Sequence, residues 1–406
     1  MSLGILAAGL ALGPDRAPAG RGRRRAVGRP DEDAVTLAVD AAAAALAGHP
    51  VAPSAVLLVS TTAPYEHGGS VQLVVELLGL QGALFATELT ATDRDGLAAL
   101  RLALSLAETG DGPVLVCATH SDRASKTTGD GAVALLIGRG DGLAELSVAG
   151  SHVEELRDRW SLRGGPRHEA DRSFVESIGT ERLARTVWDA SATAGAGARV
   201  LIDGPDARSS ARLERELGGP GDLVAPAVGH LGPAHALARL LTALAAPSQL
   251  VAVAAGQGDC LRAVPTAAGA EAAAAARALV EAPGQEIAAP PPDAVPADFH
   301  PYHSIPRSWR ERGADLRLEG ILPPGAPVPG RDNPTGTVVT WTRDCVYPAA
   351  PVTGMAIVDV DGGGRFFGQV CAGEEVEIGS RIRLVPRRLH SGGDVVQYFW
   401  KVSPCR

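Results

Sequence analysis

Residues 26–40 read AVGRPDEDAVTLAVD, and an alanine-rich run continues from there to Leu46. Three carboxylates, Asp31-Glu32-Asp33, come directly before this run, and carboxylates stabilise the N-terminus of a helix. The stretch therefore predicts a helix over 34–46.

Short apolar runs alternate with helical patterns on both sides of this helix. We predict strands at 56–60, 114–119 and 131–137 and helices at 71–78 and 96–108. A second round after Trp160 predicts helices near 182–190 and at 234–244, and strands at 199–202 and 250–255. The alternation indicates an α/β layered fold, and its recurrence indicates an internally duplicated body.

A change of composition marks a second domain. Residues 267–282 are alanine-rich and predicted helical, whereas 283–296 hold too many prolines to continue a helix or a central strand. We predict a body over 1–266, an Ala/Pro-rich linker over 267–300 and a C-terminal domain over 301–406. Five β-type runs, 336–343, 355–359, 365–371, 380–386 and 395–402, fit a small OB-type barrel.

Composition excludes several classes of protein. The net charge of −8 favours neither nucleic acid nor an anionic membrane. The basic run at 21–25 follows the apolar run at 3–12, the reverse of a secretory signal, so we expect a cytoplasmic protein with no membrane span. The five cysteines are scattered without metal-ligand spacing, so we expect free thiols and no metal.

Several segments of the body share a resemblance. Residues 26–40, 60–65, 96–100, 129–138 and 229–237 resemble, in this order, the archaeal-type 3-hydroxy-3-methylglutaryl-CoA synthases, relatives of ketosynthase III in the thiolase-like superfamily. The resemblance implies a layered αβαβα body, a homodimer, and an acyl-CoA or acyl-carrier protein as partner. No separate cofactor is implied, because the CoA or phosphopantetheine arm belongs to the substrate.

The tail resembles a different family. Residues 305–312, 316–320, 336–342 and 398–404 resemble the DUF35 OB-fold proteins that accompany thiolase-like enzymes. Those proteins commonly carry a four-cysteine zinc ribbon, whereas residues 321–333 of this chain contain no cysteine. We therefore expect the ribbon to be deleted.

The resemblance also assigns catalytic positions. The family's nucleophilic cysteine falls at Asp93, with Thr92 or Asp95 as alternative registers, and its histidine falls at Asp203. An acyl-aspartate is a mixed anhydride prone to hydrolysis, so a stable acyl-enzyme is not expected. The family's glutamate falls at Thr61 and its asparagine at His230. We predict a proton-transfer site made of Asp93, Asp203 and His230, in which the two carboxylates raise each other's pKa.

Other residues are weaker candidates, and each is also explained by a turn, a cap or a solvated loop. They are Tyr65 and Glu66 as catalytic groups, and His67, Gly256 and Gly258 as substrate-binding groups. Two functions stay open. One is a diverged condensing enzyme acting on an acyl thioester without a cysteine nucleophile. The alternative is a non-catalytic scaffold or partner subunit.

Overall fold

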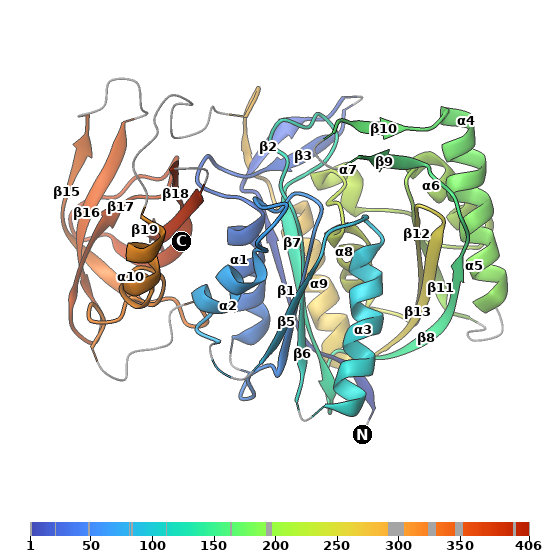
Figure 1. Ribbon diagram of the computed structural model, residues 1–406, viewed down its shortest axis with the longest axis horizontal. Coiled ribbons are helices and arrows are strands. Elements are labelled where there is room, and N and C mark those ends of the chain that lie inside the picture. Colours follow the sequence, from blue (N-terminus) through green and yellow to red (C-terminus); the bar gives the residue numbers. More distant parts are fainter. Residues whose placement is uncertain are drawn as a thin grey trace.

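The molecule has an α/β body and a C-terminal barrel packed against it (Figure 1). The structure is a computed structural model. It describes all 406 residues except 1, 21, 48, 81, 83, 111, 163–164, 192–196, 291–303, 324–329, 346–351, 393–394 and 406.

The body is built on a nine-stranded sheet in the order β11-β12-β13-β8-β1-β7-β6-β4-β5. The strands are β1 (Leu3–Leu12), β4 (Ala55–Ser60), β5 (Phe85–Leu89), β6 (Val114–His120), β7 (Gly131–Arg139), β8 (Ala144–Val153), β11 (Arg199–Asp203), β12 (Ser248–Ala254) and β13 (Gln257–Pro265). Its two halves meet where β1 pairs with β8 at Gly4–Glu145 and Ile5–Ala144.

The two halves repeat one topology. In the first half β4 is parallel to β6, β6 is antiparallel to β7, and β7 is antiparallel to β1. In the second half β11, β12, β13 and β8 are paired in the same sequence of directions. The duplication predicted from the alternating pattern is therefore confirmed.

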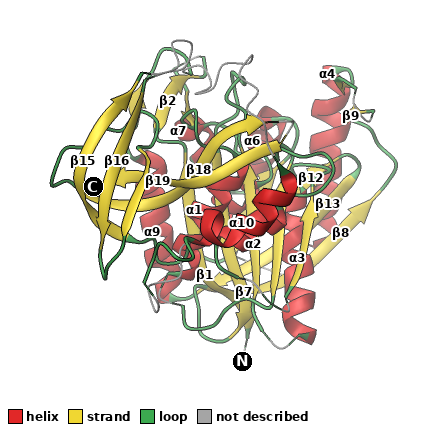
Figure 2. Cartoon of the chain, turned by 60° about the vertical axis from the view of Figure 1, so that its left-hand side comes forward, coloured by secondary structure: helices red, strands yellow, loops and turns green. Residues whose placement is uncertain are grey.

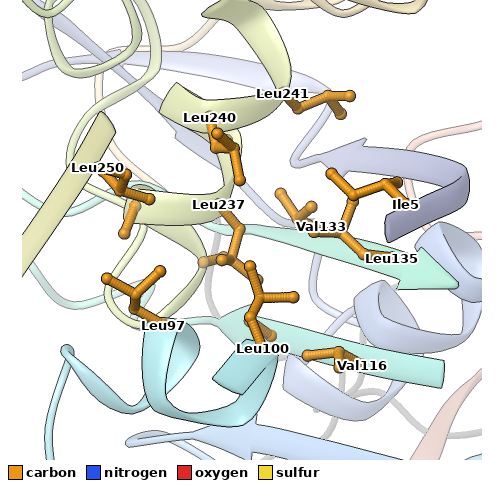
Figure 3. Packing of buried hydrophobic residues seen from close by; sticks show 14 of the residues in the cluster. Ile5, Leu97, Leu100, Val116, Val133, Leu135, Leu237, Leu240, Leu241 and Leu250 are labelled. Carbon is orange, nitrogen blue, oxygen red and sulfur yellow. The ribbon is translucent and has the colours of Figure 1, made fainter. Parts of the chain in front are cut away.

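Helices form layers on and between the two halves. Helices α1 (Ala34–Leu46) and α2 (Val71–Leu77) cover one face of the first half, and α5 (Leu183–Ser191) and α6 (Ala207–Glu216) cover the second. Between the halves lie α3 (Asp95–Thr109), α8 (Ala234–Ala243) and α9 (Ala267–Glu281), with α7 (Val224–Val228) alongside. Figure 3 shows Leu97 and Leu100 of α3 packed near Leu237 of α8 in this central core. The result is the predicted αβαβα layering.

The predicted start of α1 is confirmed in detail. Asp33 is the N-cap, and its side chain accepts hydrogen bonds from the amides of Val35 and Thr36, both at 3.0 Å. The Thr36 hydroxyl accepts in return from the Asp33 amide at 2.9 Å, which completes a capping box.

The C-terminal domain is a nearly closed five-stranded sheet, as predicted. Its order is β17-β16-β15-β18-β19, and a bridge between Val370 and Val402 brings its two edges together. The strands are β15 (Thr335–Asp344), β16 (Thr353–Val360), β17 (Arg365–Gln369), β18 (Arg381–Gly392) and β19 (Val395–Pro404). Trp400 and Phe366 fill the interior. Helix α10 (Ile305–Arg317) lies beside α2 (Figure 2), and the Trp400 indole donates to the Leu316 carbonyl oxygen at 3.1 Å.

Buried ion pairs join the barrel to the start of α1. Lys401 Nζ lies 3.0 Å from Asp31 Oδ2, and Arg387 lies 3.0 Å from Asp40 and 3.3 Å from Glu32. We call these five residues the docking cluster. The acidic segment that was expected only to cap a helix thus also holds the second domain.

One sequence-based expectation is corrected. The linker does not begin at residue 267, because α9 is an integral helix of the body whose Ala273 and Ala276 are buried in the central core. Strand β6 lies inside the sheet, between β4 and β7. The edges of the described sheet are β5 and β11.

The remaining elements are short and lie around the sheet. They are β2 (Asp15–Pro18), β3 (Arg24–Val27), β9 (Arg159–Ser161), β10 (Arg167–Glu169), α4 (Arg172–Phe174), the π-helical η1 (Val175–Arg182) and β14 (Gln285–Glu286). Within the described part of the chain, no helix has the length and apolarity needed to cross a membrane.

Candidate functional site

Polar side chains gather where strands of the two halves end. Thr61 directly follows β4, His120 is the last residue of β6, and Asp203 is the last residue of β11. The turn before α3 contributes Asp93, and the loop between α7 and α8 contributes His230. Strands β4 and β6 are parallel and end at the same edge of the sheet, where sites of α/β sheets are commonly built. Asp203 comes from β11 in the other half and is linked to this edge through His230, which is also under the charge of Asp93. We call this group the cavity cluster.

Asp203 and His230 form a hydrogen-bonded pair. His230 Nε2 lies 3.2 Å from Asp203 Oδ1, and the Gly232 amide donates to His230 Nδ1 at 3.1 Å. Because Nδ1 accepts this hydrogen bond, the imidazole proton sits on Nε2 and is donated to Asp203.

The pairing decides how the two groups titrate. Burial by itself would raise the pKa of Asp203, but the charge and hydrogen bond of His230 outweigh it and lower that pKa. Burial likewise opposes protonation of His230, but the Asp203 carboxylate outweighs it and raises the pKa of His230. Our expectation that Asp203 shares a raised pKa with Asp93 was therefore wrong, because an imidazole is its partner.

Side-chain contacts distinguish the three candidates for the nucleophile position. Asp95 caps its own turn, because its carboxylate accepts from the amides of Ala91 at 3.0 Å and Thr92 at 2.9 Å and from the Thr92 hydroxyl at 3.0 Å. Asp93 instead lies 3.5 Å from the Thr61 hydroxyl. Of the three candidates, Asp93 is the one that interacts with the groups of the cavity cluster.

His120 is a member of the site that the sequence reasoning missed. Its side chain is buried, and neither ring nitrogen has a hydrogen-bond partner among the described residues. Burial lowers its pKa to about 4, against the opposing charge of Asp93. Gly232 has a φ of +50°, and a Cβ there would lie 2.5 Å from His120 Nδ1, so the close approach of these two residues requires glycine.

His235, in the first turn of α8, stacks on His230. Their ring centroids are 4.1 Å apart, and the rings are tilted by 32°. His235 is buried, and its Nε2 lies 3.1 Å from Asp222 Oδ2. It extends the site with a second imidazole–carboxylate pair.

Three predicted loop candidates lie elsewhere. Tyr65 is bound to the barrel, because its hydroxyl accepts from the Val396 amide at 2.9 Å and donates to the Val396 carbonyl oxygen at 3.3 Å. The assignment of Tyr65 to the catalytic rim is therefore corrected to a contact between the domains. Glu66 and His67 are exposed on the same loop.

The two predicted glycines have structural explanations. Gly256 and Ala255 form the two-residue turn between β12 and β13 with φ values of +74° and +50°, as a type I′ hairpin requires. A Cβ on Gly258 would lie 2.5 Å from the Val187 side chain. Neither glycine needs a bound substrate to account for it.

The buried cysteines do not resemble nucleophiles. Burial raises the pKa of Cys117, inside β6, to about 12, and that of Cys260, inside β13, to about 11. Reactive cysteines need the thiolate form near neutral pH. The thiols of the body are therefore packing groups.

A basic pocket of about 460 Å³ lies next to the cavity cluster, and Arg25, Arg123 and Lys126 are among the residues that line it. Arg25 is buried, and its Nη1 has no hydrogen-bond partner within the described part of the chain. The pocket does not include the cavity cluster itself. The two are close at Gly229, which precedes His230 in the chain. A Cβ on Gly229 would lie 3.0 Å from the Cβ of Arg25, a residue that lines the pocket.

Comparison with known sequences finds partial relatives. No family model matches the chain. The hydroxymethylglutaryl-CoA synthase of Pyrobaculum aerophilum is 30% identical over 146 residues, which is 34% of this chain and 42% of that protein. The same enzyme of Pyrobaculum calidifontis is 28% identical over 146 residues, with the same coverage of each chain. The chain thus spans less than half the length of these relatives.

Solved structures with a similar fold cover a larger share of this chain than the sequence relatives do. The curacin pathway HMG synthase superposes with a TM-score of 0.61 at 19% identity over 71% of this chain and 86% of that one. The body has a thiolase-like fold. MvaS in complex with 3-hydroxy-3-methylglutaryl coenzyme A has a TM-score of 0.59 at 18% identity over 74% and 94% of the two chains. The 3-oxoacyl-[acyl-carrier-protein] synthase III of Aquifex aeolicus superposes with a TM-score of 0.54 at 17% identity, over 65% of this chain and 100% of that one.

Proposed function

We propose that this protein is a diverged condensing-type enzyme that makes or breaks a carbon–carbon bond, or transfers an acyl group, on a CoA- or carrier-bound thioester without a cysteine nucleophile. The observation that carries the proposal is the Asp203–His230 pair, which faces Asp93 at the shared strand ends of a thiolase-like body. The buried, protonated cysteines support it, because they leave no thiolate for acylation.

The three groups suit reversible proton transfer during carbon–carbon cleavage. In the cleaving direction Asp93 accepts the hydroxyl proton of a β-hydroxyacyl thioester, and the bond between the α and β carbons breaks. The carbonyl product leaves, and the electron pair stays on the thioester as an enolate. His230 in its imidazolium form, whose charge the Asp203 carboxylate stabilises, gives a proton to that enolate, and the proton taken up by Asp93 then restores the imidazolium. Condensation is the same path reversed.

The basic pocket supports a phosphate-bearing substrate. Three cationic side chains and the unpaired Arg25 Nη1 suit the phosphates of CoA or of a phosphopantetheine arm. Proteins of the same fold have been solved with 3-hydroxy-3-methylglutaryl coenzyme A and with a holo donor acyl carrier protein. We therefore assign the pocket to the polar end of the thioester carrier.

The test is turnover of a panel of β-hydroxyacyl and acyl thioesters, on CoA and on a carrier protein, followed by mass spectrometry. We expect His230→Gln, Asp203→Asn and Asp93→Asn each to lose about 10²–10⁴-fold in kcat. His49→Gln, beyond the C-terminal end of α1, is the matched histidine control and should keep full activity. Unchanged turnover in all three site variants would contradict the proposal.

The scaffold alternative predicts a different pattern. A non-catalytic subunit would bind CoA with no turnover by itself and would support activity only when a second protein is added. Calorimetry with CoA, run beside the turnover assay, separates the two. Binding to wild type without any product favours the scaffold.

We also propose a homodimer. Strand β5 is an edge of the described sheet, and Phe85 on it is 54% exposed. Edge strands carry unpaired backbone groups that favour pairing with a second chain. Light scattering at micromolar concentration should give twice the 41.5 kDa chain mass. A monomer mass would contradict this.

A further inference from the structure

One carboxylate oxygen and two imidazoles come together where His235 lies beside the Asp203–His230 pair. The ligand-type atoms of Asp203, His230 and His235 all lie within 4.8 Å of one another. The distance from Asp203 Oδ1 to His230 Nε2 is 3.2 Å. Ligands held about 2.0–2.1 Å from a tetrahedral zinc ion lie roughly 3.3 Å apart, so this pair already has the required spacing.

The third group has a free donor atom. His235 is 1% exposed, and its Nδ1 has no hydrogen-bond partner among the described residues. Its other nitrogen, Nε2, is bound to the Asp222 carboxylate at 3.1 Å. Zinc-ligating histidines characteristically donate their second ring nitrogen to such a carboxylate, which orients the ring and fixes the tautomer.

The carboxylate behind His235 is itself held in place. Asp222 accepts hydrogen bonds from the amides of Val224 at 2.8 Å and Ala225 at 3.1 Å, and Arg239 lies 3.7 Å from it. The orientation of His235 is therefore determined before any ion binds. A buried imidazole nitrogen kept unpaired by such a network needs a reason, because an unmet hydrogen bond is costly.

We infer that Asp203, His230 and His235 form a zinc site with three protein ligands and an open fourth position. Two histidines and one carboxylate around an open position are a donor set of catalytic zinc sites. On binding, the ion replaces the Nε2 proton of His230, and the imidazole carries its proton on Nδ1 instead. The hydrogen bond from the Gly232 amide is given up in exchange. The inference rests on this geometry and not on the proposed reaction, so it can fail while that reaction stands. If it holds, a zinc-loaded chain cannot use His230 as the proton donor, because the ion occupies Nε2.

The experiment measures Zn²⁺ binding to the full chain, without an activity assay. After chelation, the protein is titrated with Zn²⁺ by calorimetry and its metal content is measured after dialysis. We expect one ion per chain and a loss of affinity of at least 100-fold in His230→Gln and His235→Gln. Asp222→Asn should weaken binding on the order of 10–100-fold through the oriented ring. The controls His49→Gln and the double variant Cys345→Ser/Cys405→Ser should bind as wild type does.

Two further readings keep the inference falsifiable. His235 is buried, so His235→Gln can fail to fold. In that case the His230→Gln variant decides, because the His230 side chain is partly exposed. Co²⁺ in place of Zn²⁺ should give a spectrum without a thiolate charge-transfer band. Absence of binding by wild type, retained binding in His230→Gln, or a thiolate band would each overturn the site.

Discussion

The docking cluster and the cavity cluster both bury carboxylates, but they pair them differently. In the docking cluster, Asp31 pairs with Lys401, and Glu32 and Asp40 share Arg387. In the cavity, Asp203 pairs with His230, and Asp222 with His235. Arginine and lysine stay charged across the neutral range, whereas an imidazole exchanges its proton there. The two clusters therefore differ in whether the carboxylate's partner can itself exchange a proton near neutral pH.

The largest effect should come from the docking cluster. Arg387→Met leaves the buried Glu32 and the partly buried Asp40 without their shared cation, which should lower the free energy of unfolding by about 3–5 kcal/mol. The matched control is Arg365→Met, which breaks an exposed pair with Asp359 in the same barrel and should cost about 0.2–1 kcal/mol. Urea unfolding measures both. Equal losses of unfolding free energy in the two variants would mean that burial does not determine how much these ion pairs contribute to stability.

Glu32 should make stability depend on pH. Burial raises its pKa to about 7 in the folded chain, against the opposing charge of Arg387, from an ordinary value of 4.5. Between pH 4.5 and about 7, the folded chain therefore binds more protons than the unfolded chain. The free energy of unfolding should therefore fall as pH rises from 4.5 to about 7, by no more than about 3 kcal/mol.

The Glu32→Gln variant isolates this contribution. Its free energy of unfolding should vary less with pH over the window than that of wild type, because the amide does not titrate. Urea unfolding at a series of pH values gives the two curves. Curves of the same slope would show that Glu32 is ionised in the folded chain throughout.

The cavity pair should matter less for stability than for activity. Asp203→Asn keeps the shape of the side chain but weakens a charge-assisted hydrogen bond to His230, which should cost about 1–3 kcal/mol of unfolding free energy. We expect this loss to be smaller than that of Arg387→Met. A larger loss would place Asp203 among the structural carboxylates and break the distinction between the clusters.

Alkylation of thiols should have the smallest effect. Because burial holds Cys117 and Cys260 in the protonated form, iodoacetamide should leave turnover unchanged at concentrations that inactivate a cysteine-dependent condensing enzyme. Mass spectrometry should locate the label at the exposed Cys345 and Cys405. Inactivation that tracks labelling of Cys117 would return the nucleophile to the cysteines.

Part of the site was accessible from the sequence. Asp93, Asp203 and His230 follow from the resemblance, and the structure brings them to one place. His120 was missed, although it ends a buried strand just as Asp203 does, so a search for polar residues that close apolar runs would have found both. Tyr65 was misassigned because a residue on the right loop can still turn toward a domain packed against that loop.

Strands were predicted unevenly for a physical reason. The central β4 and β6 are buried along their whole length and read as continuous apolar runs. Strands β8 and β13 mix exposed and buried residues without clean alternation, and β1 was described only as an apolar run in the wrong order for a secretory signal. Such strands give a weak local signal and are defined by their neighbours in the sheet.

The sequence by itself determined the alternation of elements, the capped start of α1, the five barrel strands and the identity of the polar residues at the strand ends. These depend on local properties: apolar periodicity, capping and turn residues. The tertiary structure alone decided which groups became partners. Asp203 lies 27 positions from His230 and Asp31 lies 370 positions from Lys401. A carboxylate's pKa and its role depend on the charge that folding places beside it, and no local pattern encodes that charge.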